Sequence, residues 1–194
     1  ELRLLYLIYI ISSTRHMDTN NVDVGGILSG NWAPSTRTGK NMFLGLVQLQ
    51  RPLIAIMGPL MFFAGMFLAM NGWPSPVELA TAFVAVYLLT AAEHTIDDFI
   101  DVERDRVKWP RRAMPTGLVA RGHGGAYAAG MAASGIALSY IFFNWQLVVV
   151  ELTALGLGTL YPFMRDRVGY LSLIPIPALI GIGGWVAVSP ETLF

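Results

Sequence analysis

The sequence has no cysteine and little charge. Only 13% of its 194 residues are charged and 54% are hydrophobic, and Lys40 and Lys108 are its only lysines. The absence of cysteine excludes disulfides, thiolate-bound metals and thiol nucleophiles. Zero net charge with no basic arm argues against a nucleic-acid partner, because phosphate neutralisation requires clustered Lys and Arg. The charged fraction is about half that of an average soluble domain, which indicates a lipid environment.

The hydrophobic residues are concentrated in five long segments. Each approaches the roughly 20 residues that a helix needs to cross a bilayer. Glycine and proline are frequent within them, which membrane helices tolerate because neighbouring helices satisfy freed backbone groups and small residues allow close packing. We therefore predict an all-α, polytopic membrane helical bundle, with a soluble helical bundle as the alternative. The five predicted transmembrane helices are residues 52–70, 77–96, 124–143, 147–164 and 168–188.

Positive charges alternate between the connections of these spans. Arginine or lysine precedes the first span and occupies the second and fourth connections, whereas residues 71–76 and 144–146 contain neither. The positive-inside rule then predicts that the amino terminus and any site built by the charged loops are cytoplasmic. Glu151 lies near the outer end of the fourth span, where we expect an interfacial side chain rather than a proton relay.

The two ends of the sequence carry separate expectations. The apolar run at residues 4–11 is too short to span a bilayer, and Arg3 alone is a weak basic start for a signal peptide. Residues 1–40 are predicted to be a disordered cytoplasmic leader or an upstream extension, with Met17 the more natural start. We expect residues 41–194 to form a membrane domain that is truncated at its carboxyl end, because the chain stops directly after a predicted span.

The densest charge follows the second span, where residues 93–105 contain six carboxylates. Asp97, Asp101 and Asp105 are spaced by four, so a continuing helix would place them on one stripe, with Asp98 about 100° away. Like charges at that spacing repel each other, and a hard cation such as Mg²⁺ relieves the repulsion. The stripe would be roughly 12 Å long, longer than one metal site, so a diphosphate could share it. A solvated acidic helix end and an acidic transporter site are the alternatives.

Basic residues accompany these carboxylates. Lys108, Arg111 and Arg112 follow the acidic segment, and Arg165 follows Tyr161 at the cytoplasmic end of the fourth span. Arginine suits phosphate oxygens because its planar fork donates parallel hydrogen bonds. Carboxylates, a metal, arginines and an apolar interior together match a substrate with a diphosphate head and a long hydrocarbon tail. An isoprenyl diphosphate is such a molecule.

Three motifs, in order, resemble those of the UbiA superfamily of membrane prenyltransferases. Residues 97–101 read Asp-Asp-Phe-Ile-Asp and precede Asp105, which is similar to the family's Asn-Asp-x-x-Asp-x-x-x-Asp. Residues 112–117, Arg-Ala-Met-Pro-Thr-Gly, resemble Arg-Pro-x-Pro-Ser-Gly. Residues 161–165, Tyr-Pro-Phe-Met-Arg, resemble the Tyr-Pro-x-x-Lys segment of 4-hydroxybenzoate polyprenyltransferases.

The likeness covers about residues 45–190 and includes Arg51, which with the following proline is similar to an early basic-proline pair of the family. The sequence departs from the family at three motif positions, since Asp97 replaces asparagine, Ala113 replaces proline and Arg165 replaces lysine. The resemblance implies a fold of about nine membrane helices, with a second Asp-x-x-x-Asp motif on a later helix. This chain ends before that motif.

The resemblance also implies electrophilic transfer of a prenyl group from an isoprenyl or polyprenyl diphosphate to a lipophilic acceptor, aromatic or otherwise, in quinone or related lipid biosynthesis. It implies that Asp97, Asp101 and Asp105 are catalytic and bind Mg²⁺, a Lewis acid that draws charge onto the leaving diphosphate. Substrate-binding roles are implied for Asp98 and for five further residues, namely Arg51, Lys108, Arg112, Tyr161 and Arg165.

Paired aspartates are compatible with other functions as well. A membrane terpene cyclase of the UbiA type would use the same diphosphate site without an acceptor, and an archaeal ether-lipid prenyltransferase would prenylate a glyceryl lipid. A soluble isoprenyl diphosphate synthase shares the aspartates but not the apolar spans. A transporter or scaffold is the non-enzymatic alternative. His94, which is off the stripe, and His123, in a glycine-rich segment, are weaker catalytic candidates.

Overall fold

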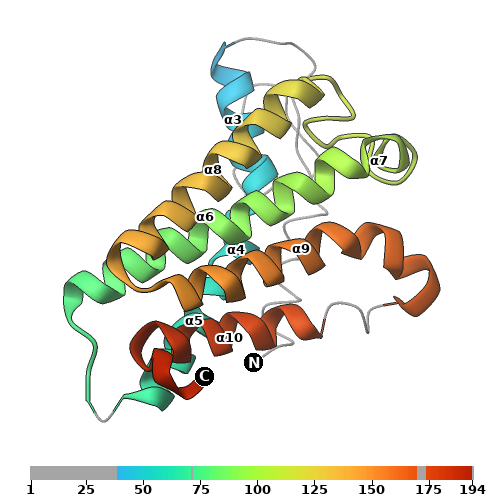
Figure 1. Cartoon of the computed structure of the whole chain (residues 1–194). Helices are drawn as coiled ribbons and strands as arrows, with labels where there is room; N and C mark the ends of the chain where they lie inside the picture. The colour runs from blue at the N-terminus through green and yellow to red at the C-terminus, as the bar shows by residue number, and fades with distance from the viewer. Residues whose placement is uncertain (1–38, 71, 170–173, 194) are drawn as a thin grey trace, which may run out of the picture.

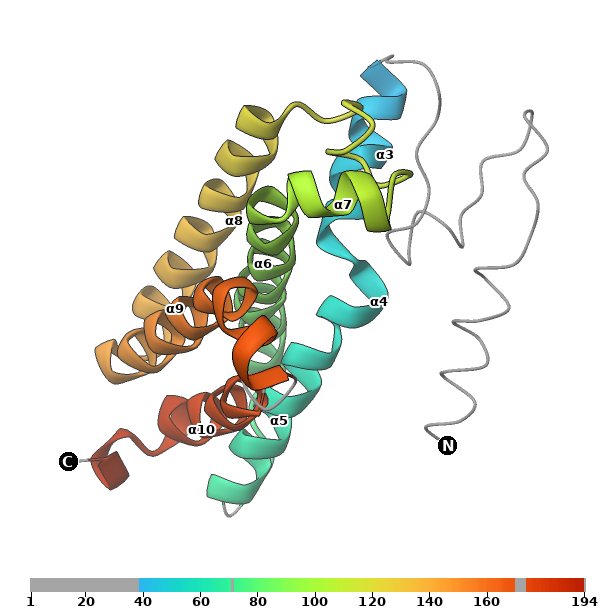
Figure 2. The ribbon, with the colours of Figure 1, turned by 90° about the vertical axis from the view of Figure 1, so that its right-hand side faces the viewer.

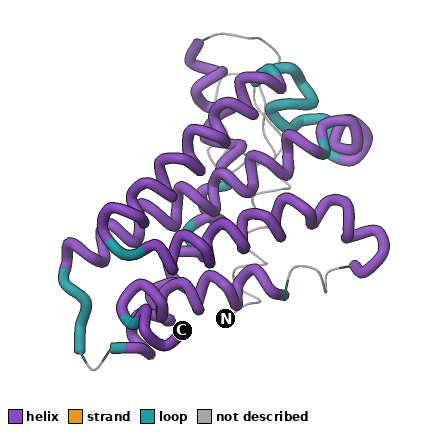
Figure 3. Tube along the Cα trace, viewed as in Figure 1, coloured by secondary structure: helices purple, strands orange, loops and turns teal. Residues whose placement is uncertain are grey.

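The computed structural model describes residues 39–70, 72–169 and 174–193. All regular structure within these residues is helical, which confirms the predicted all-α class (Figure 3). Four helical stretches are long and apolar enough to cross a membrane, which confirms the polytopic membrane bundle: Asn41–Ala69, Pro76–Ile100, Arg121–Phe142 and Trp145–Arg165. Residues 1–38, most of the predicted leader, lie outside the described residues.

Figure 1 labels the helices in chain order. The first apolar stretch is made of three consecutive helices, α3 (Gly39–Gln50), α4 (Pro52–Ala55) and α5 (Met57–Ala69). The helices that follow are α6 (Pro76–Ile100), α7 (Val102–Lys108), α8 (Arg121–Phe142), α9 (Trp145–Val168), α10 (Pro175–Val188) and the 3-10 helix η2 (Pro190–Leu193).

Two predicted spans are wrong in their bounds. The first, predicted at residues 52–70, begins already at Asn41, because α3 adds apolar helix before the polar interruption at Arg51. The last, predicted at residues 168–188, corresponds to α10, whose 14 residues make it shorter than the four spanning helices. Proline at the first position starts α10, since proline cannot donate the hydrogen bond that a continuing helix requires.

Helix α6 forms the axis of the bundle, where it contacts α3, α4, α5, α8 and α9 (Figures 1 and 2). A capping box starts it: the Ser75 hydroxyl accepts a hydrogen bond from the Glu78 N–H (3.2 Å), and the Glu78 carboxylate accepts one from the Ser75 N–H (2.7 Å). Its 25 residues correspond to about 37 Å of helix, enough to cross the hydrocarbon core.

Helices α5 and α10 cross with their backbones in contact. A Cβ added at Gly184 would lie 1.9 Å from the carbonyl oxygen of Phe62, and one added at Gly65 would lie 1.9 Å from that of Gly181. Asn144, the N-cap residue of α9, links that helix to α10, because its side-chain amide donates a hydrogen bond to the Val186 carbonyl at 3.0 Å. The two glycines therefore set the distance between these helices, as small residues do in membrane interfaces.

Glu151 on α9 is buried between helices, and its predicted place near the outer membrane interface stays a prediction. Only 8% of the residue is exposed, and its Oε1 accepts a hydrogen bond of 2.7 Å from the Ser139 hydroxyl of α8. This contact between α8 and α9 was not predicted, because the partner hydroxyl comes from a different helix, which sequence spacing does not reveal.

We expect Gly184→Ala to lower the free energy of unfolding by about 2 kcal/mol, because the methyl group overlaps the Phe62 carbonyl and forces α5 and α10 apart. Gly156→Ala is the matched control, since no atom lies within 4 Å of the added Cβ. Alanine there should be neutral or stabilising by about 0.5–1 kcal/mol. Thermal unfolding in detergent measures both, and equal unfolding temperatures would contradict the close contact.

Candidate active site

The predicted acidic stripe is bent at its middle member. Helix α6 ends at Ile100, and α7 turns across its axis (Figure 2), with Asp101 at the junction (φ −87°, ψ 7°). Helical hydrogen bonds nevertheless continue across the bend, from the Asp101 N–H to the Asp97 carbonyl at 2.9 Å and from the Asp105 N–H to the Asp101 carbonyl at 2.8 Å. The two helices thus form a corner.

A polar cavity of about 590 Å³ lies at this corner. Asp97, Asp101 and Asp105 all line it, so the bend keeps the three carboxylates together although the straight stripe is interrupted. The other lining residues are Arg51, Glu93, His94, Arg104, Lys108, Trp109, Arg112, Gly158, Tyr161 and Arg165. Every residue predicted for the site lines this cavity except Asp98.

Asp98 lies behind the cavity wall, where it holds two arginines. It is 3% exposed and pairs with Arg51 and, at 3.1 Å, with Arg112. Arg112 also reaches Asp105 at 2.6 Å, and Arg51 lies 3.8 Å from Asp97. These buried pairs fix two guanidinium groups at the cavity, because an ion that moved away from its partners would be costly in a region of low dielectric.

Arg51 reaches these carboxylates from a strained backbone. Its φ of 48° and ψ of 61° place it in the left-handed region, the only non-glycine residue with positive φ among the described residues. The Arg51 N–H bonds to the Gln48 carbonyl at 3.1 Å, which ends α3, and Pro52 then starts α4. Such a conformation costs on the order of 1–3 kcal/mol and persists where surrounding contacts hold it. Here the contact is the ion pair with Asp98.

The loop after α7 is packed, which positions Arg112. Four residues of this loop belong to a cluster of buried apolar side chains that also includes one residue of α3 and one of α7. The cluster consists of Leu49, Val102, Ala113, Met114, Leu118 and Val119. The Arg112 guanidinium lies 5.4 Å from the centre of the Trp109 ring, and the Thr116 hydroxyl donates to the Arg112 carbonyl at 2.9 Å. The predicted Arg-Ala-Met-Pro-Thr-Gly motif is therefore a rigid element that presents its first residue to the cavity.

Helix α9 supplies the opposite wall. Arg165 pairs with the two carboxylate oxygens of Asp101 at 2.6 and 2.8 Å and lies 5.8 Å from the Tyr161 ring. The side chain of Glu93 fills the space that a Cβ of Gly158 would occupy, 2.2 Å from the glutamate Oε1. Gly158 thus lets α9 approach α6 closely enough for the ion pair.

Sequence analysis underrated several lining residues. His94 lines the cavity, although it was predicted to be only a weak catalytic candidate. It precedes Asp97 by three residues, and this spacing could have indicated that the two side chains share one face of the helix. Trp109 and Arg104 are also on the wall, in the charged segment after α6. His123, by contrast, is exposed on α8 and does not line the cavity.

The carboxylates fit a cation that takes few protein ligands. Asp97 Oδ1 is buried without a hydrogen-bond partner, so it has the unmet demand that a cation would satisfy. The described residues bring together no group of three or more His, Asp or Glu side chains that could hold a metal ion. Mg²⁺ commonly takes one or two carboxylates and completes its shell with water and substrate phosphate, so the donor set suits a metal bound together with a diphosphate.

The family model of UbiA prenyltransferases matches residues 59–193, which is more than half of the chain. The chain belongs to the UbiA prenyltransferase family. Together with its four spanning helices, this membership makes it an integral membrane protein. The family predicted from the three motifs is thereby confirmed.

Several archaeal proteins called digeranylgeranylglyceryl phosphate synthase are similar to this chain. That of Pyrococcus abyssi is 27% identical over 73% of this chain, and that of Halobacterium salinarum is 30% identical over 64%. The matches cover 56% and 45% of those two proteins, so the chain spans about half the length of the curated relatives it matches.

A solved structure also shares the fold. A chain from work on digeranylgeranylglyceryl phosphate synthase in membranes superposes with a TM-score of 0.69 at 19% sequence identity. The superposition covers 78% of this chain and 56% of the solved chain. At this identity the match supports the fold alone.

We expect Asp98→Asn to lower the free energy of unfolding by about 3 kcal/mol, because Arg51 loses its directly bonded carboxylate and Arg112 loses one of its two, which leaves an excess of buried positive charge. The control is Glu103→Gln, which breaks the exposed Glu103–Arg106 pair and should cost less than about 1 kcal/mol. Thermal or denaturant unfolding of both variants in detergent tests the difference. Similar losses would show that the buried pairs do not hold the site together.

Proposed function

We propose that the protein transfers a prenyl group from an isoprenyl diphosphate to a hydroxyl group of a lipophilic glyceryl phosphate, as in archaeal ether-lipid synthesis. One observation carries the proposal: a cavity with arginines and carboxylates borders a second, apolar cavity, and Glu93 lines both. The polar cavity suits a diphosphate head, and the apolar helix faces beside it suit a hydrocarbon tail.

The ether-lipid acceptor has more support than the aromatic acceptor that we first expected. The relatives that match are named digeranylgeranylglyceryl phosphate synthase, and their printed name describes a glyceryl phosphate with prenyl chains. A transporter or scaffold has no support from family membership. A terpene cyclase of the UbiA type remains distinguishable by experiment, since it requires no acceptor.

The arginines would change partners when substrate binds. Arg51, Arg112 and Arg165 now pair with carboxylates of the cavity or behind it. A diphosphate that enters the cavity could accept hydrogen bonds from the same guanidinium groups. Lys108, exposed at the cavity rim, adds a further positive charge. Tyr161 would donate its hydroxyl to phosphate from the α9 wall. These residues would hold the head group while the tail lies along the apolar faces of the helices.

One or two of the carboxylates of Asp97, Asp101 and Asp105 would hold Mg²⁺, which supplies Lewis-acid stabilisation of the diphosphate charge when it is bound. The arginines released from these carboxylates would bind the leaving group electrostatically. In the reaction the allylic carbon–oxygen bond breaks and its electron pair leaves with the diphosphate. The acceptor oxygen then bonds to that carbon, and its proton passes to solvent water.

The cavity would open on the cytoplasmic side. The charged segments that build it, residues 101–112 and the end of α9, belong to the connections that are rich in arginine. By the positive-inside rule these connections stay in the cytoplasm, where Mg²⁺ is available to the site.

We expect the full-length protein in detergent to form a prenylated product from geranylgeranyl diphosphate and a prenylated glyceryl phosphate, with release of one diphosphate per product. An aromatic acid such as 4-hydroxybenzoate should not replace the acceptor. Product and diphosphate are both measured. Diphosphate release without acceptor would indicate a cyclase, and no turnover with any acceptor would contradict the proposal.

We also expect Asp97→Ala to raise the Mg²⁺ concentration for half-maximal activity at least about tenfold, a loss of the size seen when metal-site residues are altered. Glu103→Gln, outside the cavity, is the control and should leave that concentration unchanged. A titration of activity against Mg²⁺ measures both. An unaltered Mg²⁺ requirement in Asp97→Ala would exclude this carboxylate as a ligand.

A further inference from the structure

The arginine and lysine residues that line the polar cavity divide into two groups. Arg51, Arg112 and Arg165 come from three different segments, and each bonds directly to an aspartate of the corner between α6 and α7. The other two, Arg104 and Lys108, both come from α7. The function proposed above uses the three arginines for the diphosphate. It counts Lys108 only as a further charge and gives Arg104 no role.

Arg104 and Lys108 lie on the face of α7 that is turned toward the cavity. They are four residues apart, so their side chains leave the helix on the same side, and both line the cavity. Glu103 and Arg106, on the outer face, pair with each other at 2.8 Å and do not line it. Lys108 is exposed, which places this end of the pair at the cavity rim.

The charges of Arg104 and Lys108 favour an anion between them. Like charges at a spacing of four residues destabilise a helix. Asp101 and Asp105 also line the cavity, but they already bond to Arg165 and Arg112, each at 2.6 Å. An anion with several oxygens, such as a phosphate, could accept hydrogen bonds from both basic side chains and relieve their repulsion.

The acceptor proposed above brings a second anion to this cavity. The glycerol unit of a glyceryl phosphate has three carbons, so its hydroxyl lies one or two carbons from the carbon that bears the phosphate. When the hydroxyl approaches the allylic carbon of the donor, the acceptor phosphate must therefore come close to the diphosphate. Two phosphates at short distance repel each other, so the cavity needs positive charge for each of them.

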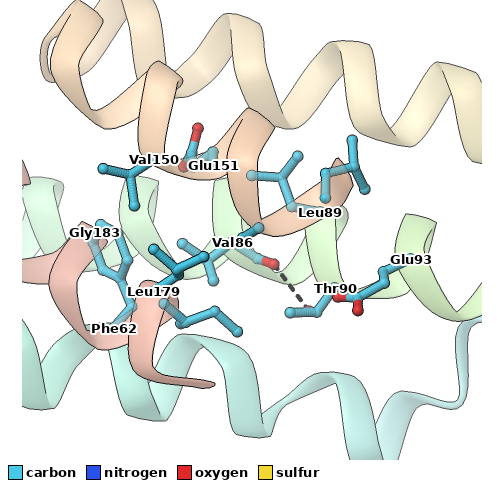
Figure 4. A pocket seen from close by; sticks show the side chains of 12 residues that line it. Phe62, Val86, Leu89, Thr90, Glu93, Val150, Glu151, Leu179 and Gly183 are labelled. Carbon is cyan, nitrogen blue, oxygen red and sulfur yellow. Dashed lines mark hydrogen bonds between the residues drawn. The ribbon is translucent and has the colours of Figure 1, made fainter. Parts of the chain in front are cut away.

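The inner apolar cavity does not suit the acceptor phosphate. Its volume is about 40 Å³, and apolar side chains such as Phe62 and Val86 form most of its wall (Figure 4). Among the described residues that line it, the ionisable ones are Glu93 and Glu151, which are both acids. A phosphate there would lack both space and positive charge. The cavity face of α7 offers the positive charge that the inner cavity lacks.

We propose that Arg104 and Lys108 bind the phosphate of the glyceryl phosphate acceptor. The guanidinium and ammonium groups would donate charge-assisted hydrogen bonds to its oxygens. Trp109, which lines the same cavity and is 44% exposed, is a side chain typical of the membrane surface, where the head group of a lipid acceptor lies. The pair would thereby select a phosphorylated glyceryl lipid over an uncharged alcohol. The inference rests on the proposed prenyl transfer.

The test uses the full-length protein with geranylgeranyl diphosphate and two acceptors, geranylgeranylglyceryl phosphate and the same molecule without its phosphate. In Arg104→Gln we expect kcat/KM for the phosphorylated acceptor to fall about tenfold, because a hydrogen bond between charged groups is lost. The value for the acceptor without phosphate should stay within about twofold of the wild type. The KM for geranylgeranyl diphosphate should also stay within about twofold. Lys108→Gln should lower the ratio of the two acceptor values in the same direction.

Arg106→Gln is the matched control, because it removes the same charge from the outer face of α7, and it should leave the acceptor ratio unchanged. Thermal unfolding in detergent identifies a variant that does not fold, and Lys108→Gln replaces Arg104→Gln in that case, since Lys108 is exposed. An unchanged ratio in a folded, active variant would overturn the proposal, as would an equal loss with both acceptors.

A higher KM for geranylgeranyl diphosphate in Arg104→Gln, with an unchanged acceptor ratio, would assign the residue to the donor and overturn the proposal as well. Equal use of the two acceptors by the wild type would have the same consequence. No transfer by the wild type to either acceptor would instead refute the prenyl transfer itself.

Discussion

The pairing of buried charges at the end of α6 is the constraint on which the rest of the site depends. A membrane helix that ends in several carboxylates needs positive charge close by, since unpaired ions are costly where water is scarce. Asp98 pairs with two arginines, Arg51 before it in the sequence and Arg112 after it. The same two contacts hold a left-handed residue before α4 and a packed loop after α7. The cavity wall is thus built around a carboxylate that does not itself line the cavity.

Small residues make this arrangement sterically accessible. Gly158 lets α9 come near enough to α6 for Arg165 to reach Asp101, and Gly184 and Gly65 allow α5 and α10 to touch through their backbones. In a bilayer, where lipid offers no hydrophobic drive for helix association, such close packing supplies much of the cohesion. These glycines therefore set how closely the helices around the apolar cavity pack. Larger residues at the same places would separate the helices that enclose it.

Much of the fold, and most of the residues that line the polar cavity, could be predicted from local sequence patterns. Four spans were found because their hydropathy is continuous, and the acidic residues because their spacing is helical. The bend at Asp101 and the left-handed Arg51 were not predicted, because both depend on partners distant in sequence. Asp98 was expected about 100° from the stripe, yet its two arginines could not be identified from spacing. The burial of Glu151 was missed for the same reason, since Ser139 comes from another helix.

The ion pairs also differ in when they can form during synthesis. Asp98 follows Arg51 by 47 residues and precedes Arg112 by 14, so its partners are present once the loop after α7 has emerged. Asp101 must wait for Arg165, which is made 64 residues later. Because chains are inserted from the amino terminus onward, the α6 end would first acquire its inner pairs and only afterwards be closed by α9. Asp101, at the bend, would thus lack its Arg165 partner through the insertion of α8, and the arrival of α9 would complete the cavity.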